Sequence, residues 1–572
     1  MGKIYTTLVF LLSFVGFATA QTWIPDTLFG TNSLLYVNPG AGDELSNFVL
    51  QPDGKIIAGG YDYDISFNGY NNIMIRFDAC GTIDSSFGSG GIVKHRFDQR
   101  NRGFSYALHT GNKILCAGLQ SNSNAGSDQI PFIARYNPDG SVDDSFGYNG
   151  THALRFDSVT SGALYSVIPL ADGRILCGGT VNASSYGGAN GMGAMRFLEN
   201  GMLDITFNTK GKVIYKKNTV FNPVRAALMQ NGDVILTGRY ADSNGNFHFV
   251  AVSYNQSGDL NYGYGTDGEF TDPVDLSEDY IGAYMGVQQD EKIVLASMRK
   301  DADDGIEVIR IMPGGYLDPS FGDNGHVNLV YDRIRCTGVK ILEDSRILIL
   351  CQYRVDYYSG AVICLLPDGS VDSGFGDNGL LFVNMNPGGT HQINDALELP
   401  NERILFGTGT FDMHFKGYTT HSNVPHISGD AFMLSTTGSG TFQWYLNGEA
   451  IPGETSSSCI PQANGDYTVE ITSDSGCTLL SDPYTVNSVG INEPSLSELQ
   501  IYPNPFSSEF QIKTGKEMKS VALFDPAGRA IISKANLNTS NLKLQTAGLA
   551  PGIYFLKVVV DGKPVVSKIL RQ

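Results

Sequence analysis

Short stretches in which apolar and polar residues alternate recur along most of the chain. In one sample they cover residues 92–97, 104–109, 113–120 and 131–137, and a Pro-Asp-Gly turn follows at 138–140. Alternation with a period of two is typical of β-strands with one buried face, and Gly, Pro, Asn and Asp mark the turns between them. No stretch has a sustained helical period. The pattern predicts an all-β protein built from units of four antiparallel strands.

A motif repeats through this strand-rich part of the chain. A glycine is followed three residues later by aspartate, three further on by phenylalanine, and then by glycine. The aspartate column falls at positions 26, 84, 143, 204, 261, 318 and 372; the first copy is partial, and those at 204 and 261 have drifted. A second column, in which a turn such as Asp53-Gly54-Lys55 precedes an apolar run, also occurs seven times. Two independent columns with the same count predict seven structural repeats.

Seven four-stranded units predict a seven-bladed β-propeller over residues 21–436, with its last strand at 431–434. In this interpretation the aspartate accepts backbone hydrogen bonds of its own turn, the aromatic residue fills the space between blades, and the glycines supply positive φ. A ring of structural calcium loops is the alternative, although each loop offers one or two acids and calcium takes about six to eight oxygen ligands. The predicted scaffold residues are Asp84, Phe87, Asp143, Phe146, Asp204, Phe207, Asn261, Tyr264, Asp318, Phe321, Asp372 and Phe375.

The N-terminus has the pattern of a secretory signal peptide over residues 1–20. Lys3 precedes an apolar run at 7–17, and small residues at 18–20 fit cleavage between Ala20 and Gln21. The run is too short to span a bilayer, and no later stretch reaches 18 apolar residues. We therefore expect an exported protein, secreted or attached to the outer cell surface, and not an integral helical membrane protein.

Charge separates the C-terminal segment from the rest of the chain. The chain carries a formal net charge of −19, but residues 497–572 hold ten Lys and Arg against five Asp and Glu, a net of +5. The remainder therefore carries −24, which is −19 minus +5. A polyanion such as nucleic acid is an unsuitable partner for so acidic a body. Two segments of opposite charge indicate two different roles.

Residues 441–488 form a further strand-rich segment, which resembles a small Ig-like module and is followed by a linker at 489–496. Trp444 precedes an Asn-Gly turn, and an alternating strand covers 467–471. Cys459 and Cys477 lie here and are candidates for a disulfide, which the chain-entropy model values at about 3 kcal/mol for such a loop. The alternative is two unpaired thiols.

Two parts of the chain resemble known families. The aspartate and turn columns, over about residues 26–436, resemble the delta-60 repeat, a bacterial repeat that implies a propeller-like fold and no agreed activity. Residues 497–572 contain Tyr-Pro-Asn-Pro at 502–505, Asp-x-x-Gly-Arg at 525–529 and Gly-x-Tyr at 552–554. They resemble the type A C-terminal sorting domain of the type IX secretion system. That resemblance implies a compact β-sandwich and the type IX machinery as a partner.

The chain offers little catalytic chemistry. His414, His421 and His426 cluster and are weak candidates for metal ligands, because imidazole binds zinc, but a polar insertion explains them more simply. No nucleophile, zinc-protease or phosphate-binding motif occurs, and we predict no cofactor and no catalytic residue. Tyrosine and acidic residues fill loops such as 61–64 and 353–358. We therefore expect a non-catalytic propeller that binds a glycan or a protein; the alternatives are a purely structural protein and, less favoured, a carbohydrate-active enzyme.

Overall fold

The structure is a computed structural model of the full chain. It describes residues 23–40, 42–66, 68–98, 100–121, 129–156, 161–182, 191–216, 220–277, 282–300, 305–355, 357–385, 392–409, 412–420, 425–438, 440–473, 476–487, 499–526 and 528–572. The predicted signal peptide with its cleavage site at Ala20 and Gln21, His421 and the predicted linker at 489–496 lie outside these residues. The chain divides into two compact units, residues 1–421 and 422–572, which are described separately.

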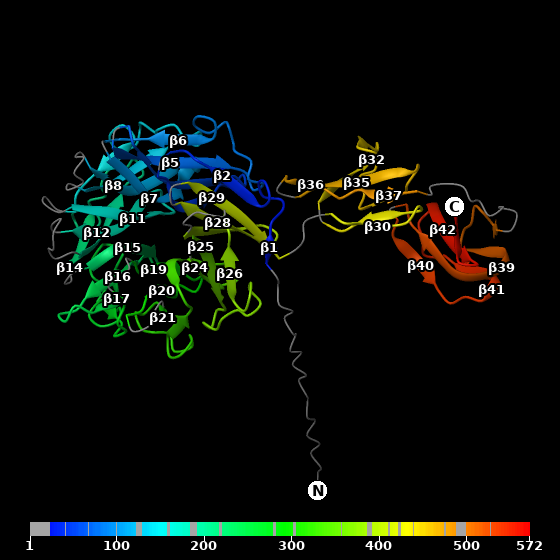
Figure 1. The fold of residues 1–572 in the computed structure, drawn as a ribbon. Coiled ribbons are helices and arrows are strands. Elements are labelled where there is room, and N and C mark those ends of the chain that lie inside the picture. The colour runs from blue at the N-terminus through cyan, green and yellow to red at the C-terminus, as the bar shows by residue number, and fades with distance from the viewer. Residues whose placement is uncertain are drawn as a thin grey trace, which may run out of the picture. The chain divides into compact units, whose positions relative to one another are not determined.

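The described part of the first unit contains seven sheets, which form the blades of a propeller (Figure 1). Each blade is antiparallel, and its first strand contacts the first strand of the next blade. Contact between β27(Ile393–Leu399) and β3(Glu44–Leu50) closes the ring. The first strands are therefore innermost. Blades 1 to 3 consist of β3(Glu44–Leu50), β4(Ile56–Asp64), β5(Gly69–Phe77) and β6(Ile92–His95); β7(Arg100–Leu108), β8(Ile114–Ser121), β9(Ile130–Tyr136) and β10(Thr151–Ala153); and β11(Ser161–Pro169), β12(Ile175–Asn182), β13(Gly191–Phe197) and β14(Lys212–Lys216).

Blades 4 to 7 continue the same order. They consist of β15(Val220–Leu228), β16(Val234–Ala241), β17(Phe247–Tyr254) and β18(Glu269–Thr271); β19(Tyr284–Val287), β20(Ile293–Met298), β21(Gly305–Ile311) and β22(His326–Val330); β23(Ile334–Ile341), β24(Ile347–Val355), β25(Tyr357–Leu365) and β26(Leu380–Val383); and β27(Ile393–Leu399), β28(Arg403–Gly409) and β29(Met413–Thr419) with β1(Ile24–Pro25) and β2(Leu34–Val37). Seven blades confirm the predicted fold class. Among the described residues, the helical segment is one 3₁₀ turn, η1(Thr110–Asn112), and no helix is long and apolar enough to cross a bilayer.

The N-terminal strands close the ring. β1 and β2 pair antiparallel with β29, so the seventh blade is assembled from both ends of the propeller. Asp26 Oδ2 accepts a hydrogen bond from Arg403 Nε at 2.5 Å, and Arg403 Nη2 donates to the Ala79 carbonyl of blade 1 at 2.7 Å. Trp23 is buried with its ring 5.4 Å from that of Phe375. These contacts fix the first residues of the propeller between its last blades and blade 1.

Two strand assignments made from the sequence are wrong. Residues 92–97 were predicted to open a repeat unit, but β6 pairs with β5 and is the outermost strand of blade 1. The sequence repeat is therefore displaced by one strand from the structural blade. Residues 431–434 were predicted to end the propeller at 436, but β31(Leu434–Thr436) pairs with β30(Ile427–Gly429) and β34(Ser458–Cys459) in the second unit.

Each repeat aspartate ties its own turn to a cation of the same blade. In blade 1, Asp84 Oδ1 accepts hydrogen bonds from the Ser86 N–H at 3.0 Å and the Ser86 hydroxyl at 2.6 Å. Its Oδ2 accepts one from Arg76 Nε at 2.8 Å and pairs with Lys55 Nζ at 2.8 Å. Both oxygens are engaged by protein donors, so the calcium alternative has no observation in its favour. The corresponding ion pairs are Arg135–Asp143 at 2.6 Å, Arg196–Asp204 at 2.7 Å and Arg310–Asp318 at 2.9 Å.

The same arginine reaches the neighbouring blade. Arg76 Nη1 donates to the carbonyl of Pro138, in blade 2, at 2.6 Å. Its guanidinium carbon lies 4.5 Å from the centre of the fully buried Phe87 ring, within the range of a cation–π contact. One guanidinium thus holds the turn, the aromatic ring and the next blade together. Equivalent hydrogen bonds join Arg135 to Glu199 and Arg196 to Gln256, both at 2.6 Å, and Arg310 to Pro367.

The glycine of the next turn lets the two blades approach. Gly140 has a φ of 88°, and a Cβ built on it would lie 3.0 Å from the Phe87 ring. The Gly88 N–H donates to the Asp139 carbonyl at 2.9 Å across the same junction. A larger residue at 140 would strain the backbone and push the turn away from Phe87. We call this set of aspartate, arginine, aromatic and glycine contacts the interblade latch.

Blades 4 and 6 carry a changed latch. In blade 4, Ser253 stands at the arginine position and Asn261 at the aspartate position, and Asn261 Nδ2 donates to Asp233 at 2.9 Å. In blade 6, Cys364 replaces the arginine, and Arg346 Nη1 pairs with Asp372 at 3.4 Å. A buried charge without a partner would be strongly unfavourable. Blade 4 avoids one because it lacks both members of the pair, and blade 6 because a cation comes from another strand.

The second unit begins with a small module of two sheets, the Ig-like module. The first sheet contains β30, β31 and β34; the second contains β32(Thr441–Leu446), β33(Glu449–Ala450), β35(Gly465–Thr472), β36(Thr478–Leu480) and β37(Tyr484–Val486). Trp444 is fully buried between them, and its Nε1 donates to the Ser456 carbonyl at 2.8 Å. The indole packs in a core that includes Leu434 and Val469.

The predicted Cys459–Cys477 disulfide is wrong. Cys459 is a free, buried thiol in the core around Trp444. Its strand β34 pairs with β31, whereas Cys477 precedes β36 in the other sheet. Burial raises the pKa of the Cys459 thiol to about 12, as expected for a packed side chain that stays protonated.

The C-terminal domain is built around one long strand. It contains β38(Gln500–Tyr502), β39(Glu509–Phe524), β40(Ala530–Lys534), β41(Thr539–Gln545), β42(Gly552–Val560) and β43(Lys563–Arg571). The first half of β39 pairs with β38 and β41, and its second half with β40 and β42. Because one strand serves both groups, the apolar faces enclose a common core that includes Phe510, Leu523 and Leu556.

The latch predicts a large effect of one substitution in blade 2. We expect Arg135→Ala to lower the free energy of unfolding of the propeller by about 2–4 kcal/mol, because Asp143 would keep only Lys113 as a cationic partner and the contacts of Arg135 with the Phe146 ring and the Glu199 carbonyl would be lost. The measurement is the urea or calorimetric transition of the propeller. The control is Asp332→Asn, which neutralises an exposed ion pair with Arg333 and should change stability by about 0.5 kcal/mol or less. Equal shifts for both variants would contradict the latch.

Candidate functional site at the propeller axis

A bulge in the innermost strands shapes the wall around the propeller axis. The register between first and second strands shifts by one residue in β3, β7, β11, β23 and β27. The residue after the bulge binds the next blade: Ser105 Oγ accepts from the Val167 N–H at 3.1 Å, and Ser166 Oγ from the Ala226 N–H at 3.0 Å. Bulges re-aim side chains in this way near binding sites. Here the bulges let the innermost strands of adjacent blades bind each other, and they leave the bulged residues free for other contacts.

Side chains from non-adjacent blades interact at this ring. Burial lowers the pKa of Arg225, in blade 4, and the charges of Tyr284 of blade 5, Asp395 of blade 7 and Tyr165 of blade 3 oppose this lowering. Tyr284 in turn interacts with Glu44 of blade 1. Blades 1, 4 and 7 can come this close only at the axis. We call this set the axial cluster; its members are Glu44, Arg102, Tyr165, Arg225, Arg239, Tyr284 and Asp395.

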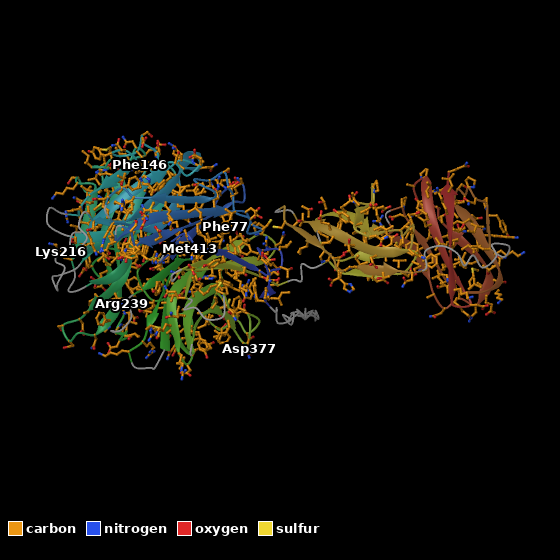
Figure 2. All side chains as sticks on the ribbon, turned by 45° about the horizontal axis from the view of Figure 1, so that its top comes forward. Phe77, Phe146, Lys216, Arg239, Asp377 and Met413 are labelled. Carbon is orange, nitrogen blue, oxygen red and sulfur yellow. The ribbon has the colours of Figure 1, made fainter. Side chains whose placement is uncertain are left out.

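The three arginines of the axial cluster differ in their contacts. The guanidinium of Arg102 lies 3.7 Å from the centre of the Tyr70 ring and 5.4 Å from that of Tyr61. Arg239 is 1% exposed, its Nη1 donates to the Ser277 carbonyl at 2.9 Å, and burial lowers its pKa to about 10. Figure 2 labels Arg239 among the side chains of the propeller. Arg225 is partly exposed and makes no hydrogen bond or ion pair with the described residues, and burial lowers its pKa.

The two carboxylates of the cluster are already engaged. Asp395 Oδ2 accepts a hydrogen bond from the Phe48 N–H at 2.8 Å, and its Oδ1 pairs with Lys340 Nζ at 3.4 Å. The Tyr61 hydroxyl donates to Glu44, whose pKa is raised by burial. Asp395 therefore links blade 7 to blade 1, and Glu44 is held within blade 1.

Aromatic rings continue from the axial cluster into blade 1. Phe104 stacks on Tyr165 with ring centres 4.8 Å apart and planes 12° apart. Tyr61 meets Phe104 edge to face at 5.7 Å, and Tyr70 packs against Tyr61 at the same distance. Tyr63 follows at 5.2 Å from Tyr70. The loop tyrosines noted in the sequence, Tyr61 and Tyr63, thus belong to a continuous aromatic row over blades 1 to 3.

Asp62, next to these tyrosines, forms a separate pair with Asp43 beside Gly40. Asp43 and Asp62 are each 1% exposed, and one oxygen of each has no hydrogen-bond partner. A Cβ on Gly40 would lie 2.5 Å from Asp62 Oδ2 and 3.0 Å from Asp43 Oδ1. Lys94 Nζ pairs with Asp62 at 2.8 Å. Burial raises the pKa of Asp43 to about 7; the Gly40 N–H opposes this rise and the charge of Asp62 adds to it.

The histidines predicted as weak metal candidates are distributed over both units. His414 lies buried in β29, with its ring 4.9 Å from that of Tyr36. His426 directly precedes β30 in the second unit, and His421 is outside the described residues. Over the described ranges no three His, Cys, Asp or Glu side chains are placed to hold a metal ion. The predicted scaffold residues lie in the latch between blades and not at the axial cluster.

The sequence pattern did not predict the axial residues, because no one residue type occupies their positions from blade to blade. The column after the bulge holds Asn47, Ser105, Ser166, Arg225, Tyr284, Gly338 and Asp395. The sequence feature that could have identified them is a variable column and not a recurring motif. It is one position of the innermost strands that varies in chemistry from blade to blade, and three of the axial residues, Arg225, Tyr284 and Asp395, occupy it.

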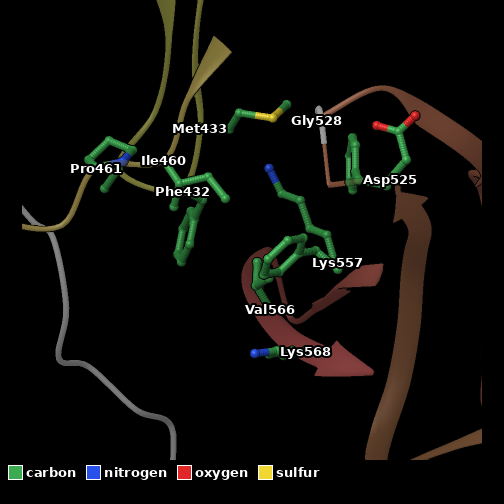
Figure 3. A pocket seen from close by; sticks show the side chains of 12 residues that line it. Phe432, Met433, Ile460, Pro461, Asp525, Gly528, Lys557, Val566 and Lys568 are labelled. Carbon is green, nitrogen blue, oxygen red and sulfur yellow. The ribbon is translucent and has the colours of Figure 1, made fainter. Parts of the chain in front are cut away.

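A cavity of about 390 Å³ lies in the second unit, between the Ig-like module and the C-terminal domain (Figure 3). Phe432 and Met433 line one side, and Lys557 reaches across to pair with Asp430 at 3.1 Å. Gly528 approaches Met433 so closely that a Cβ would lie 2.8 Å from its sulfur. The walls are mainly apolar and carry no nucleophile or acid pair, which is typical of packing between two modules.

Comparison with known proteins agrees with this division of the chain. Residues 500–572 match the secretion system C-terminal sorting domain, and residues 51–87, 112–146 and 170–207 match a β-propeller domain of unknown function. No curated protein matches the chain. The chain is therefore an exported repeat β-propeller, and its C-terminal domain is a sorting domain of the type IX secretion system, which directs it to the cell surface or the extracellular space.

Solved structures resemble the chain only in fold. The extracellular domains 1–2 of Drosophila semaphorin 1a are 8% identical over 68% of this chain and 88% of theirs, with a TM-score of 0.38. The propeller domain of the trilobed protease from Pyrococcus furiosus is 8% identical over 67% and 98%, with a TM-score of 0.35. An ulvan lyase is 11% identical over 66% and 91%, with a TM-score of 0.32. Likeness at this level carries no information on activity.

Asp43 predicts an unusual pH dependence of stability. Its folded pKa of about 7 lies above the ordinary value of 3.8, so between these values the folded state binds more protons than the unfolded state. Stability should therefore fall as the pH rises from 4 to 7 and level off above 7.

The substitution Asp43→Asn should remove the contribution of Asp43 to this slope, while Glu269, whose pKa burial also raises to about 7, keeps its own. At pH 8 we expect the variant to be more stable than the parent by about 1–3 kcal/mol, and at pH 4 nearly equal to it. The measurement is urea unfolding of both proteins across this range. Asp53→Asn, at an exposed turn, is the control and should leave the slope unchanged. The assignment would be contradicted if the stability of the parent protein rose from pH 4 to 7 and the Asp43→Asn substitution abolished that rise.

Proposed function

We propose that the mature protein is a non-catalytic propeller that binds an extracellular glycan at the axial cluster. The observation that supports this proposal is the aromatic row that ends in partly exposed guanidinium groups. Ligand sites are mainly apolar and aromatic with a few directed polar groups, and propellers receive ligands near the axis. Sugar rings present apolar C–H faces to aromatic rings and hydroxyls to polar donors. Tyr165 and Phe104 offer the first, and Arg225 the second.

A binding role fits the chemistry of the cluster better than catalysis. An acid–base pair needs carboxyl groups that can exchange protons with a substrate. Glu44 and Asp395 instead accept hydrogen bonds or ion pairs from Tyr61, Phe48 and Lys340. The latch explains the repeated residues, so the variable axial residues are the part of the propeller that a ligand would select.

Glycan binding predicts a loss in a single aromatic variant. We expect Tyr165→Ala to weaken binding of the exported protein to its preferred polysaccharide about tenfold, or 1.4 kcal/mol, because a stacking surface is lost. Calorimetric titration after a polysaccharide screen measures this. Tyr262→Ala is the control, since that ring is 72% exposed and lies away from the axial cluster. No binding to any polysaccharide in the screen would overturn the proposal.

The sorting domain predicts the fate of a truncated chain. Removal of residues 500–572 should leave the propeller inside the cell envelope, because the type IX machinery handles its cargo through this domain. Fractionation of the producing cells, followed by detection of the propeller, measures the distribution. Normal delivery of the truncated chain to the surface or the medium would contradict the assignment.

A further inference from the structure

The junction between blades 4 and 5 is held differently from the latched junctions. In blade 4 a serine stands at the position from which the latch arginine of blades 1, 2, 3 and 5 reaches the next blade. Residues 272–277, which follow β18, cross this junction instead. The Leu276 N–H donates to the Phe247 carbonyl of blade 4 at 2.8 Å, and the Ser277 N–H to the Met298 carbonyl of blade 5 at 2.9 Å. We call residues 272–277 the strap.

His248, on β17 of blade 4, faces the strap with both ring nitrogens. Its Nδ1 lies 3.1 Å from the Val274 carbonyl, which can only accept a hydrogen bond, so Nδ1 carries a proton. Its Nε2 lies 3.6 Å from Asp242 Oδ2 and 3.7 Å from Asp275 Oδ1. A neutral ring would direct the lone pair of Nε2 at these two carboxylates, whereas a protonated ring directs an N–H at them. The site therefore favours the imidazolium form.

His326, on β22 of blade 5, lies between two buried carboxylates. Its Nδ1 is 2.8 Å from Glu307 Oε1, and its Nε2 is 3.5 Å from Oδ2 of Asp272, the first residue of the strap. That oxygen of Asp272 accepts no hydrogen bond from the residues that the structure describes. A neutral imidazole has one N–H and can serve one of the two carboxylates, whereas the imidazolium serves both. This site also favours the protonated ring.

More acids than fixed cations meet at the strap. Beside the two histidines, the charged and titratable side chains there are Asp242, Asp272, Asp275, Glu307, Arg239, Arg299, Lys300 and Tyr240. Arg299 pairs with Glu307 at 2.9 Å. Burial raises the pKa of Asp272 and that of Glu307, and His326 opposes the rise at both. Each histidine proton therefore adds a positive charge where carboxylates lack one.

We propose that the strap makes the junction between blades 4 and 5 pH-sensitive: protonated His248 and His326 hold the strap to both blades, and the loss of their protons releases it. Histidine changes charge between about pH 5 and 8. Because the folded junction favours the protonated rings, it is strongest at the acid end of this range and weakens as the pH rises. With no latch arginine here, the ring opens first at this junction. The inference is independent of glycan binding.

Hydrogen exchange of the exported protein, followed by mass spectrometry, measures the strap directly. We compare peptides that cover residues 269–277 with peptides that cover β9 and β10, at the latched junction of blades 2 and 3. After correction for intrinsic exchange, the protection of the strap relative to β9 and β10 should fall at least about tenfold between about pH 5.5 and pH 8. The double variant His248→Gln and His326→Gln should abolish this fall, because glutamine does not titrate.

The matched control is His152→Gln. His152 is buried in β10, and its Nδ1 faces the Gly201 carbonyl of blade 3 at 2.8 Å, so its loss should leave the pH response of the strap unchanged. An equal change of the strap and of β9 and β10 in the parent protein would overturn the inference, and so would an undiminished fall in the double variant. If the double variant fails to fold, the comparison of the two junctions within the parent protein still decides.

Discussion

The structure depends on one ion pair, between an arginine and an aspartate, that recurs from blade to blade. A four-stranded sheet alone leaves two faces open, and the propeller is stable only when each blade covers the next. In blade 1 the guanidinium of Arg76 binds Asp84, lies over Phe87 and donates to the Pro138 carbonyl of blade 2. A glycine at 140 then permits the close approach. Where the arginine is absent, either the acid is absent too, as beside Ser253, or a cation from another strand replaces it, as Arg346 does for Asp372.

The latch and the axial cluster have different roles in each repeat. Latch residues recur because every junction has the same geometry, and a change at one of them leaves a buried charge or a clash. Axial residues lie where the innermost strands of blades with different sequences meet, so the residue type at each of these positions can differ. A rigid ring of this kind holds Arg225, Tyr165 and Tyr284 in fixed relation although they come from three blades. Such preorganisation is what a weakly polar site needs to select a ligand.

Much of the fold could be predicted from the sequence, because the latch residues recur as a recognisable sequence motif. The Asp84 and Phe87 columns and the Lys55 turn column each count blades correctly. The arginine of the latch escaped notice since it lies eight residues before its aspartate, on the preceding strand, and blades 4, 6 and 7 lack it at that position. The strand at 431–434 was misassigned because alternation says that a strand exists and not which sheet it joins. The axial cluster could not be predicted, since it brings together residues far apart in sequence that share no motif.

The closure of the ring by β1 and β2 sets the order of assembly. Their partner β29 ends at Thr419, so the seventh blade cannot form until almost the whole propeller is available. A chain that emerges from its N-terminus carries these strands unpaired through synthesis and passage across the inner membrane. Both β29 and the last interblade contact stay open edges during that time, and open edges pair readily with other chains. The two ends of the propeller are therefore joined twice, by the contact of β27 with β3 and by the pairing of β29 with β1 and β2.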